Sequence, residues 1–187
     1  MTVPLVDHFC VEAMSHNGKE WIARLEAEQL TVLNDTVFGD IDNIAIQVAG
    51  STSGEQLAEG EVSQLDSLYT GKPLVTTKGY DHIMLRVNDV DKTAAFYQKM
   101  FGLSPVERSN GKVWVSDGNL RLGWRETLAG EQPGIEYYAI RTEPFEVDAF
   151  SRNVEALGAK SVEEFNERDN ILLFRDPDGI KVGLVPV

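Results

Sequence analysis

Hydrophobic and polar positions in the second half of the chain follow two alternating patterns. Residues 80–87 (YDHIMLRV) alternate with a period of two, which predicts a strand. Residues 89–102 place four apolar side chains on one helical stripe, between an Asp at the start and a Gly at the end, which predicts a helix. Three more strands are expected, at 104–108, 112–116 and 119–125. The dipeptides Asn-Gly at 110–111 and Asp-Gly at 117–118 favour hairpin turns between them.

The same order of elements then occurs again. It comprises a strand at 135–142, a helix at 144–158 and strands at 161–166, 170–175 and 180–185. Residues 81–86 (DHIMLR) correspond to 136–141 (EYYAIR), and residues 120–124 (LRLGW) correspond to 180–184 (IKVGL). This repeat predicts an α+β fold in which two βαβββ units form one curved, mixed, eight-stranded sheet with its helices outside.

Residues 1–78 have a different character and are assigned as a region separate from 79–187. One helix is expected at 18–33 and one short strand at 42–48. Residues 49–60 are polar and rich in Gly and Ser, so a mobile linker is expected there.

This first region is too short and too poor in aromatic residues to bury a large core alone. We therefore expect Trp21, Leu25 and Leu30 to pack on the second region or on a partner chain. Residues 42–46 (DNIAI) weakly resemble residues 81–85 (DHIML), but no βαβββ pattern follows them, and the likeness is attributed to chance.

The composition narrows the class of protein. Hydrophobic residues make up 42% and charged residues 25%, which is typical of a soluble globular protein. No apolar run approaches the roughly 20 residues that span a bilayer. A formal net charge of −13 argues against binding to nucleic acid or to anionic membranes. The single cysteine excludes an internal disulfide, and no signal peptide is visible, so a cytoplasmic location is expected.

Three possible metal or nucleophile side chains lie near the N-terminus, namely His8, Cys10 and His16. Structural zinc sites usually have four ligands at tighter spacing, and no fourth ligand lies nearby. We interpret these residues as ordinary surface histidines and an isolated thiol.

Two motifs in the second region resemble those of a known family. They are residues 80–87 (YDHIMLRV) followed by 91–97 (DKTAAFY), and residues 174–179 (FRDPDG). Together with the repeat, they resemble the vicinal oxygen chelate superfamily. This superfamily includes glyoxalase I, fosfomycin-resistance enzymes, bleomycin-binding proteins and extradiol dioxygenases. The resemblance covers residues 79–187, and residues 1–78 resemble no family.

The resemblance also identifies the positions at which active members hold a divalent metal. The first strand of each unit generally supplies His or Gln, and the fourth supplies Glu. Here these positions hold His82, Gly123, Tyr137 and Gly183. Glycine has no ligand atom and neutral tyrosine is a poor ligand, so only His82 is retained and no metal cofactor is expected. His82 is equally well interpreted as a hydrogen-bonded strand histidine. Strand alternation places Glu136 on the face opposite Tyr137.

The same alternation predicts a basic concave face. If His82 points inward, four cationic residues share its side of the sheet: Arg86, Arg121, Arg141 and Lys181. No carboxylate is predicted there, and the two glycines are expected to leave space. Alternatively, the four cations lie near strand ends and pair with acidic residues of a partner chain or of residues 1–78.

These observations predict a protein that binds a small organic molecule, anionic in character, without metal catalysis. The expected ligand-binding residues are His82, Arg86, Arg121, Tyr137, Arg141 and Lys181, and no catalytic residue is assigned. One alternative is a divalent-metal-dependent lyase or dioxygenase of the same superfamily, and another is a degenerate interaction module. Relatives with two units often dimerise, so a homodimer is expected by analogy.

Overall fold

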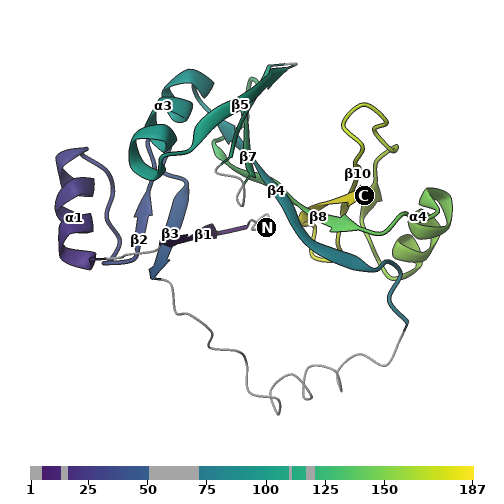
Figure 1. Ribbon diagram of the computed structural model, residues 1–187. Coiled ribbons are helices and arrows are strands. Elements are labelled where there is room, and N and C mark those ends of the chain that lie inside the picture. The colour runs from purple at the N-terminus through teal and green to yellow at the C-terminus, as the bar shows by residue number, and fades with distance from the viewer. Residues whose placement is uncertain (1–5, 14–16, 51–71, 110, 117–120) are drawn as a thin grey trace, which may run out of the picture.

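The computed structural model describes residues 6–13, 17–50, 72–109, 111–116 and 121–187. Most of the expected linker, the segment that follows it and the turn at 117–118 lie outside these described residues. The described strands form one sheet of eight strands and one of three (Figure 1). No helix among the described residues has the length and apolar character needed to cross a membrane.

The first βαβββ unit of the large sheet has the elements that the sequence predicted. It consists of β4 (Thr77–Val87), α3 (Val90–Phe101), β5 (Ser104–Ser109), β6 (Lys112–Ser116) and β7 (Arg121–Glu126). The ends of α3 follow the sequence signals. The Asp89 carboxylate accepts backbone N–H bonds from the first turn, and Gly102 ends the helix with a left-handed backbone (φ 71°).

The second unit repeats this order. It consists of β8 (Gly134–Thr142), α4 (Val147–Ala156), β9 (Ser161–Val162), β10 (Leu172–Arg175) and β11 (Lys181–Pro186). Strands run in the order β5-β6-β7-β4-β8-β11-β10-β9, and the units meet where β4 and β8 pair antiparallel. In each unit the first and last strands pair parallel. The two-unit α+β fold is confirmed.

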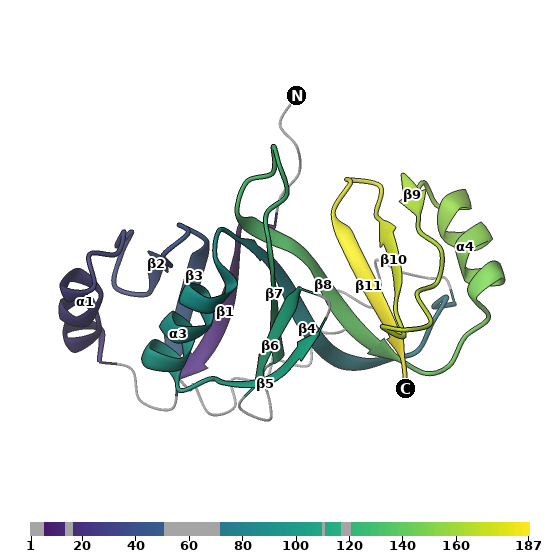
Figure 2. The same ribbon diagram turned by 90° about the horizontal axis from the view of Figure 1, so that it is seen from above.

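The large sheet curls so that its two halves approach each other across one face. Lys112 of β6 and Asp169, which precedes β10, form an ion pair of 2.8 Å although five steps of the strand order separate their strands. Met84, Trp114 and Tyr137 belong to one buried cluster on this concave face. Helices α3 and α4 pack on the other face, as the view from above indicates (Figure 2).

The N-terminal region also contains a small sheet, which the sequence analysis did not predict. Its elements are β1 (His8–Ala13), α1 (Gly18–Ala27), β2 (Val37–Gly39) and β3 (Ala45–Gly50). Strand β1 pairs parallel with β3, β3 pairs antiparallel with β2, and a single bridge joins residue 32 to β2. This is the order of β4-β7-β6-β5, so the region is a reduced third βαβββ unit.

The helix expected at 18–33 is shorter for a local reason. Gln29 takes a left-handed backbone conformation (φ 59°), which ends the helical path. Val32 then forms the bridge that stands in for a full second strand. A single bridged residue has no period-two pattern, which is why the sequence did not reveal this unit.

The third unit shares its core with α3. This confirms the expectation that its apolar residues pack on the second region. Leu25 lies in the same buried cluster as the α3 side chains, and Trp21 and Leu30 pack against that cluster. The rings of Trp21 and Phe38 lie 5.9 and 6.4 Å from the ring of Phe101. Contacts of this kind make the third unit part of one continuous core with the large sheet.

A buried acid sits at this junction. The Asp40 side chain accepts hydrogen bonds from the backbone N–H groups of Asp42 and Ile44 and from the Tyr97 hydroxyl at 2.9 Å. Burial raises the pKa of Asp40 to about 6. A proton equilibrium is therefore built into the contact between the third unit and α3.

Candidate concave-face site

A bulge in β4 turns an acidic residue toward His82. The pairing of β4 with β8 shifts register between Tyr80 and His82, which leaves Asp81 as an extra residue. Bulges re-aim side chains in this way. The Asp81 Oδ1 atom lies 2.6 Å from His82 Nδ1, and Arg121 Nη1 lies 3.9 Å from the same oxygen. The hydrogen bond with His82 is the main cause that lowers the pKa of Asp81.

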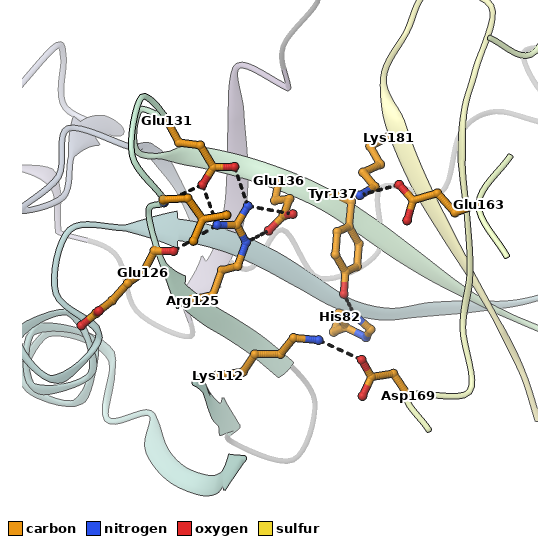
Figure 3. Close-up of polar contacts among 11 residues, drawn as sticks. His82, Lys112, Arg125, Glu126, Glu131, Glu136, Tyr137, Glu163, Asp169 and Lys181 are labelled. Atoms are coloured by element: carbon orange, nitrogen blue, oxygen red, sulfur yellow. Dashed lines mark hydrogen bonds and ion pairs between the residues drawn. The ribbon is translucent and has the colours of Figure 1, made fainter. Parts of the chain in front are cut away.

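A second bulge, in β8, has the same effect on Glu136. The register shifts between Ile135 and Tyr137 and leaves Glu136 as an extra residue. Its carboxylate lies 2.6 Å from Nε of Arg125, which belongs to the concave-face side of β7 (Figure 3). Alternation had placed Glu136 on the opposite face. That prediction is wrong, because an extra residue breaks the period of two.

His82 is held between two polar partners on the concave face. Its Nε2 atom lies 3.3 Å from the Tyr137 hydroxyl, and its ring meets Trp114 edge-on with centroids 4.8 Å apart. When Asp81 binds the Nδ1 proton, Nε2 is left as the acceptor for the Tyr137 hydroxyl. Burial raises the pKa of Tyr137, so this hydroxyl stays protonated. The imidazole is fixed in orientation and able to accept a proton at Nε2.

The two glycines at the metal positions do not leave open space. A Cβ atom on Gly123 would lie 2.6 Å from Cζ3 of Trp114, and one on Gly183 would lie 2.6 Å from Cδ1 of Ile171. Both distances are far below ordinary carbon contacts. The expectation of a roomier concavity is therefore wrong, because bulky side chains of other strands fill these places.

The residues present do not fit the divalent metal that the family commonly binds. Of the four positions, His82 offers an imidazole, the two glycines offer no atom and Tyr137 is protonated. Within the described ranges, no three or more His, Cys, Asp or Glu side chains come together as a metal site would require. No chemical step is therefore derived through a metal here.

Three of the four predicted cations have partners within the chain. Arg121 lies 4.2 Å above the Trp114 ring and 3.5 Å from Glu107 as well as near Asp81. Arg141 donates two hydrogen bonds to the Tyr80 carbonyl, at 2.9 and 2.7 Å.

Lys181 likewise forms an ion pair of 2.8 Å with Glu163 (Figure 3). The prediction that this face lacks carboxylates is therefore wrong. Bulged and loop residues supply them, and period-two alternation cannot foresee either.

Arg86 differs in having no hydrogen-bonded partner within the described ranges, although its charge helps to lower the pKa of Glu131. No described residue accepts a hydrogen bond from its guanidinium, and its Nε atom is buried. It lines a cavity of about 240 Å³ together with Arg125, Arg175 and Lys181. Because a buried donor without an acceptor is unfavourable, Arg86 marks a place where an acceptor is missing.

Arg125, beside it, is already neutralised. It donates to the Glu131 carboxylate at 2.6 and 2.9 Å and to the Glu136 carboxylate at 2.6 and 3.1 Å (Figure 3). These bonds lower the pKa of Glu131 to about 2 and raise the pKa of Arg125. Two carboxylates face one guanidinium here, so the second negative charge offsets Arg86, which also helps to lower the pKa of Glu131. With Arg175, the cavity keeps a surplus of one positive charge.

The predicted ligand-binding residues divide between two places. His82, Arg121 and Tyr137 line a polar cavity of about 290 Å³, which the Lys112–Asp169 ion pair borders. Arg86 and Lys181 line the cavity of about 240 Å³. Arg141 lines neither of these two cavities.

The third unit carries its own pair of side chains at the corresponding positions. Cys10, two residues after His8, pairs with Gln47. In the same way Met84, two residues after His82, pairs with Gly123. His8 Nε2 lies 3.2 Å from Gln47 Oε1. The sequence signal was the Asp-His dipeptide at 7–8, which is repeated at the corresponding place in β4.

Comparison with known proteins supports this description of the fold. The family model described as Glyoxalase/Bleomycin resistance protein/Dioxygenase superfamily matches residues 79–184. The Mn(II)-bound glyoxalase from Novosphingobium aromaticivorans shares the fold, with a TM-score of 0.66 and 13% identity over 95% of this chain and 62% of that one. BphC, a halotolerant catechol dioxygenase, gives a TM-score of 0.62 and 13% identity over 95% and 66% of the two chains.

Both matches include the third unit, because they cover 95% of this chain. The chain itself spans less than two thirds of the length of each of these two proteins. No curated protein matches its sequence.

Proposed function

Because the chain belongs to the Glyoxalase/Bleomycin resistance protein/Dioxygenase superfamily, we propose that it binds a small organic anion on the concave face of its large sheet without a metal ion. The acid group of the ligand, a carboxylate or a phosphate, is taken by Arg86. The observation that carries this proposal is the partly buried Arg86 guanidinium, which has no acceptor among the described residues.

The surroundings of Arg86 favour an anion over a neutral ligand. Arg86, Arg125 and Arg175 line the cavity against the carboxylates of Glu131 and Glu136, and Lys181 is paired with Glu163, so one positive charge is in surplus. An arginine fork takes two oxygens at once, and a charge-assisted bond of this kind is strong where water is largely excluded. A cavity of about 240 Å³ suits a small acid rather than a large one.

A second candidate function is proton transfer at His82. The Asp81 carboxylate, 2.6 Å from Nδ1, holds the ring as in many general bases, and Nε2 faces the Tyr137 hydroxyl. A ligand in the polar cavity would replace that hydroxyl as the partner of Nε2. The metal-dependent lyase or dioxygenase is disfavoured by the donor set, since Gly123 and Gly183 supply no ligand atoms.

The proposal is tested by calorimetric titration of protein dialysed against EDTA. Inorganic phosphate, phosphoglycolate and malonate serve as probes, and Arg86→Gln is compared with the wild type. A charge-assisted hydrogen bond is worth about 1.5–3 kcal/mol, so the affinity should fall about tenfold to a hundredfold. Arg152→Gln, an exposed arginine of α4, is the matched control and should bind as the wild type does.

Two results contradict the proposal. One is that none of the three probes binds to the wild type. The other is that Arg86→Gln and Arg152→Gln bind a probe equally well, which would place the anion elsewhere.

A further inference from the structure

A further cavity borders β1 of the third unit. This cavity of about 510 Å³ lies between β1 and strands β4 and β8, and it shares Asp81, His82 and Arg121 with the polar cavity. Its volume is within the range of roughly 300–1,000 Å³ that is typical of small-molecule sites. Apolar or aromatic side chains from all three strands line it, among them Phe9, Ile83, Ile135 and Tyr138.

We propose that this cavity binds an uncharged, largely apolar ligand with one or two aromatic rings. The wall is aromatic at its rim as well as inside. Tyr80 is 71% exposed, and its ring lies 6.4 Å from the ring of Tyr138. An exposed tyrosine beside an apolar hollow offers a flat surface to a flat ligand at little cost in conformational entropy.

The charged side chains that line the cavity favour neither an anion nor a cation as its ligand. Asp81 and Arg121 both line it and lie 3.9 Å apart, so each is the counter-ion of the other. The two histidines that line it also have partners, because His8 contacts Asp7 and Gln47, and His82 contacts Asp81 and Tyr137. No net charge is left for a charged ligand to neutralise, and burying one would be costly.

A hydroxyl group in the wall can orient the ligand. The Tyr138 hydroxyl forms no hydrogen bond with any residue that the structure describes, and burial raises its pKa, so it remains a neutral donor. A single acceptor on the ligand, such as a hydroxyl oxygen, completes the site. A mostly apolar wall with one well-placed polar group is the usual composition of a small-molecule pocket.

This cavity borders the one proposed for anions, since Val6 and Ile135 line both, but it lacks the anion-binding arginine. Arg86 lines the anion cavity and does not line this one. The wall formed by β1 belongs to the third unit, so a bound ligand joins that unit to the large sheet. Ligand binding should therefore stabilise the contact between the two parts of the chain.

Cys10 makes the proposal directly testable. It is the single cysteine of the chain, it is exposed, and it lines the cavity. Modification of its thiol by N-ethylmaleimide is followed by mass spectrometry with and without 1-naphthylmethanol. When this probe is present at ten times its Kd, only the unbound fraction reacts, so the rate should fall about tenfold.

Matched comparisons locate the effect. Tyr80→Ala should weaken protection severalfold, whereas Leu128→Ala, which replaces an equally exposed apolar residue outside the cavity, should not. Arg86→Gln should also leave protection unchanged. The charged analogue 1-naphthoate should protect at least tenfold less well at equal concentration.

The proposal is overturned if saturating 1-naphthylmethanol does not slow modification of the wild-type protein. It is also overturned if 1-naphthoate protects equally well, or if Tyr80→Ala and Leu128→Ala behave alike. Circular dichroism of each variant confirms that the comparison is made between folded proteins.

Discussion

Replacing Gly123 with alanine tests whether the concave face is filled at a metal position. The new Cβ atom would lie 2.6 Å from Cζ3 of Trp114 and 2.7 Å from Cε of Met84. Carbon atoms normally approach to about 3.5–4.0 Å, so a neighbour must move by about 1 Å. The Met84 methyl can rotate away. The Trp114 ring cannot do so easily, because Arg121 lies over it at 4.2 Å.

The expected magnitude follows from two opposing effects. Overpacking a buried site costs about 1–3 kcal/mol. Apart from this clash, alanine inside a strand stabilises the folded protein relative to glycine by about 0.5–1 kcal/mol. We expect Gly123→Ala to lower the free energy of unfolding by about 1–2 kcal/mol, measured from the urea midpoint at an unchanged slope.

A double-mutant cycle isolates the clash. Trp114→Leu removes the ring atoms that Cβ would meet, so in that background Gly123→Ala should be neutral or stabilising. The coupling between the two changes should therefore be about 2 kcal/mol. The reasoning is refuted if Gly123→Ala stabilises the wild-type protein, or if its effect is the same in both backgrounds.

Three further results are expected from variants elsewhere in the chain. The pKa of Asp40 is raised from 3.8 to about 6, so the free energy of unfolding should fall by roughly 3 kcal/mol between about pH 4 and pH 7. Asp40→Asn should flatten this pH profile in urea unfolding. A flat profile for the wild-type protein contradicts the prediction. Arg125→Met should raise the pKa of Glu131 from about 2 toward 4.5 in an NMR titration, because its main hydrogen-bond donor is lost; an unchanged pKa argues against the pairing. Phe38→Ala, at a fully buried position, should cost about 3–5 kcal/mol in a single thermal transition; loss of only a small separate transition would mean that the third unit folds independently.

Much of the large sheet could be predicted from periodicity and turn chemistry. The βαβββ pattern occurs twice with long strands, and its first helix carries clear end signals at Asp89 and Gly102. The third unit was missed because its second strand is reduced to a single bridge at Val32 and its β2 strand has three residues. Such short pieces carry no measurable period.

The site was predicted less well than the fold, and the cause is specific. A period of two holds only while every residue is paired, and Asp81 and Glu136 are extra residues at bulges. Each brings a carboxylate to the side of cations that alternation had left without partners. Nor does strand alternation show that the places beside the glycines are filled from the neighbouring strand, as Trp114 of β6 fills the place beside Gly123.

The central claim, that the concave face binds an organic anion without a metal, is tested most directly by one calorimetric comparison. Phosphoglycolate is titrated into the full-length protein in EDTA and again in the presence of Mn²⁺. The account predicts binding with the same Kd in both buffers, because Arg86 supplies the charge that holds the acid group. Binding that is measurable only with Mn²⁺ would contradict it.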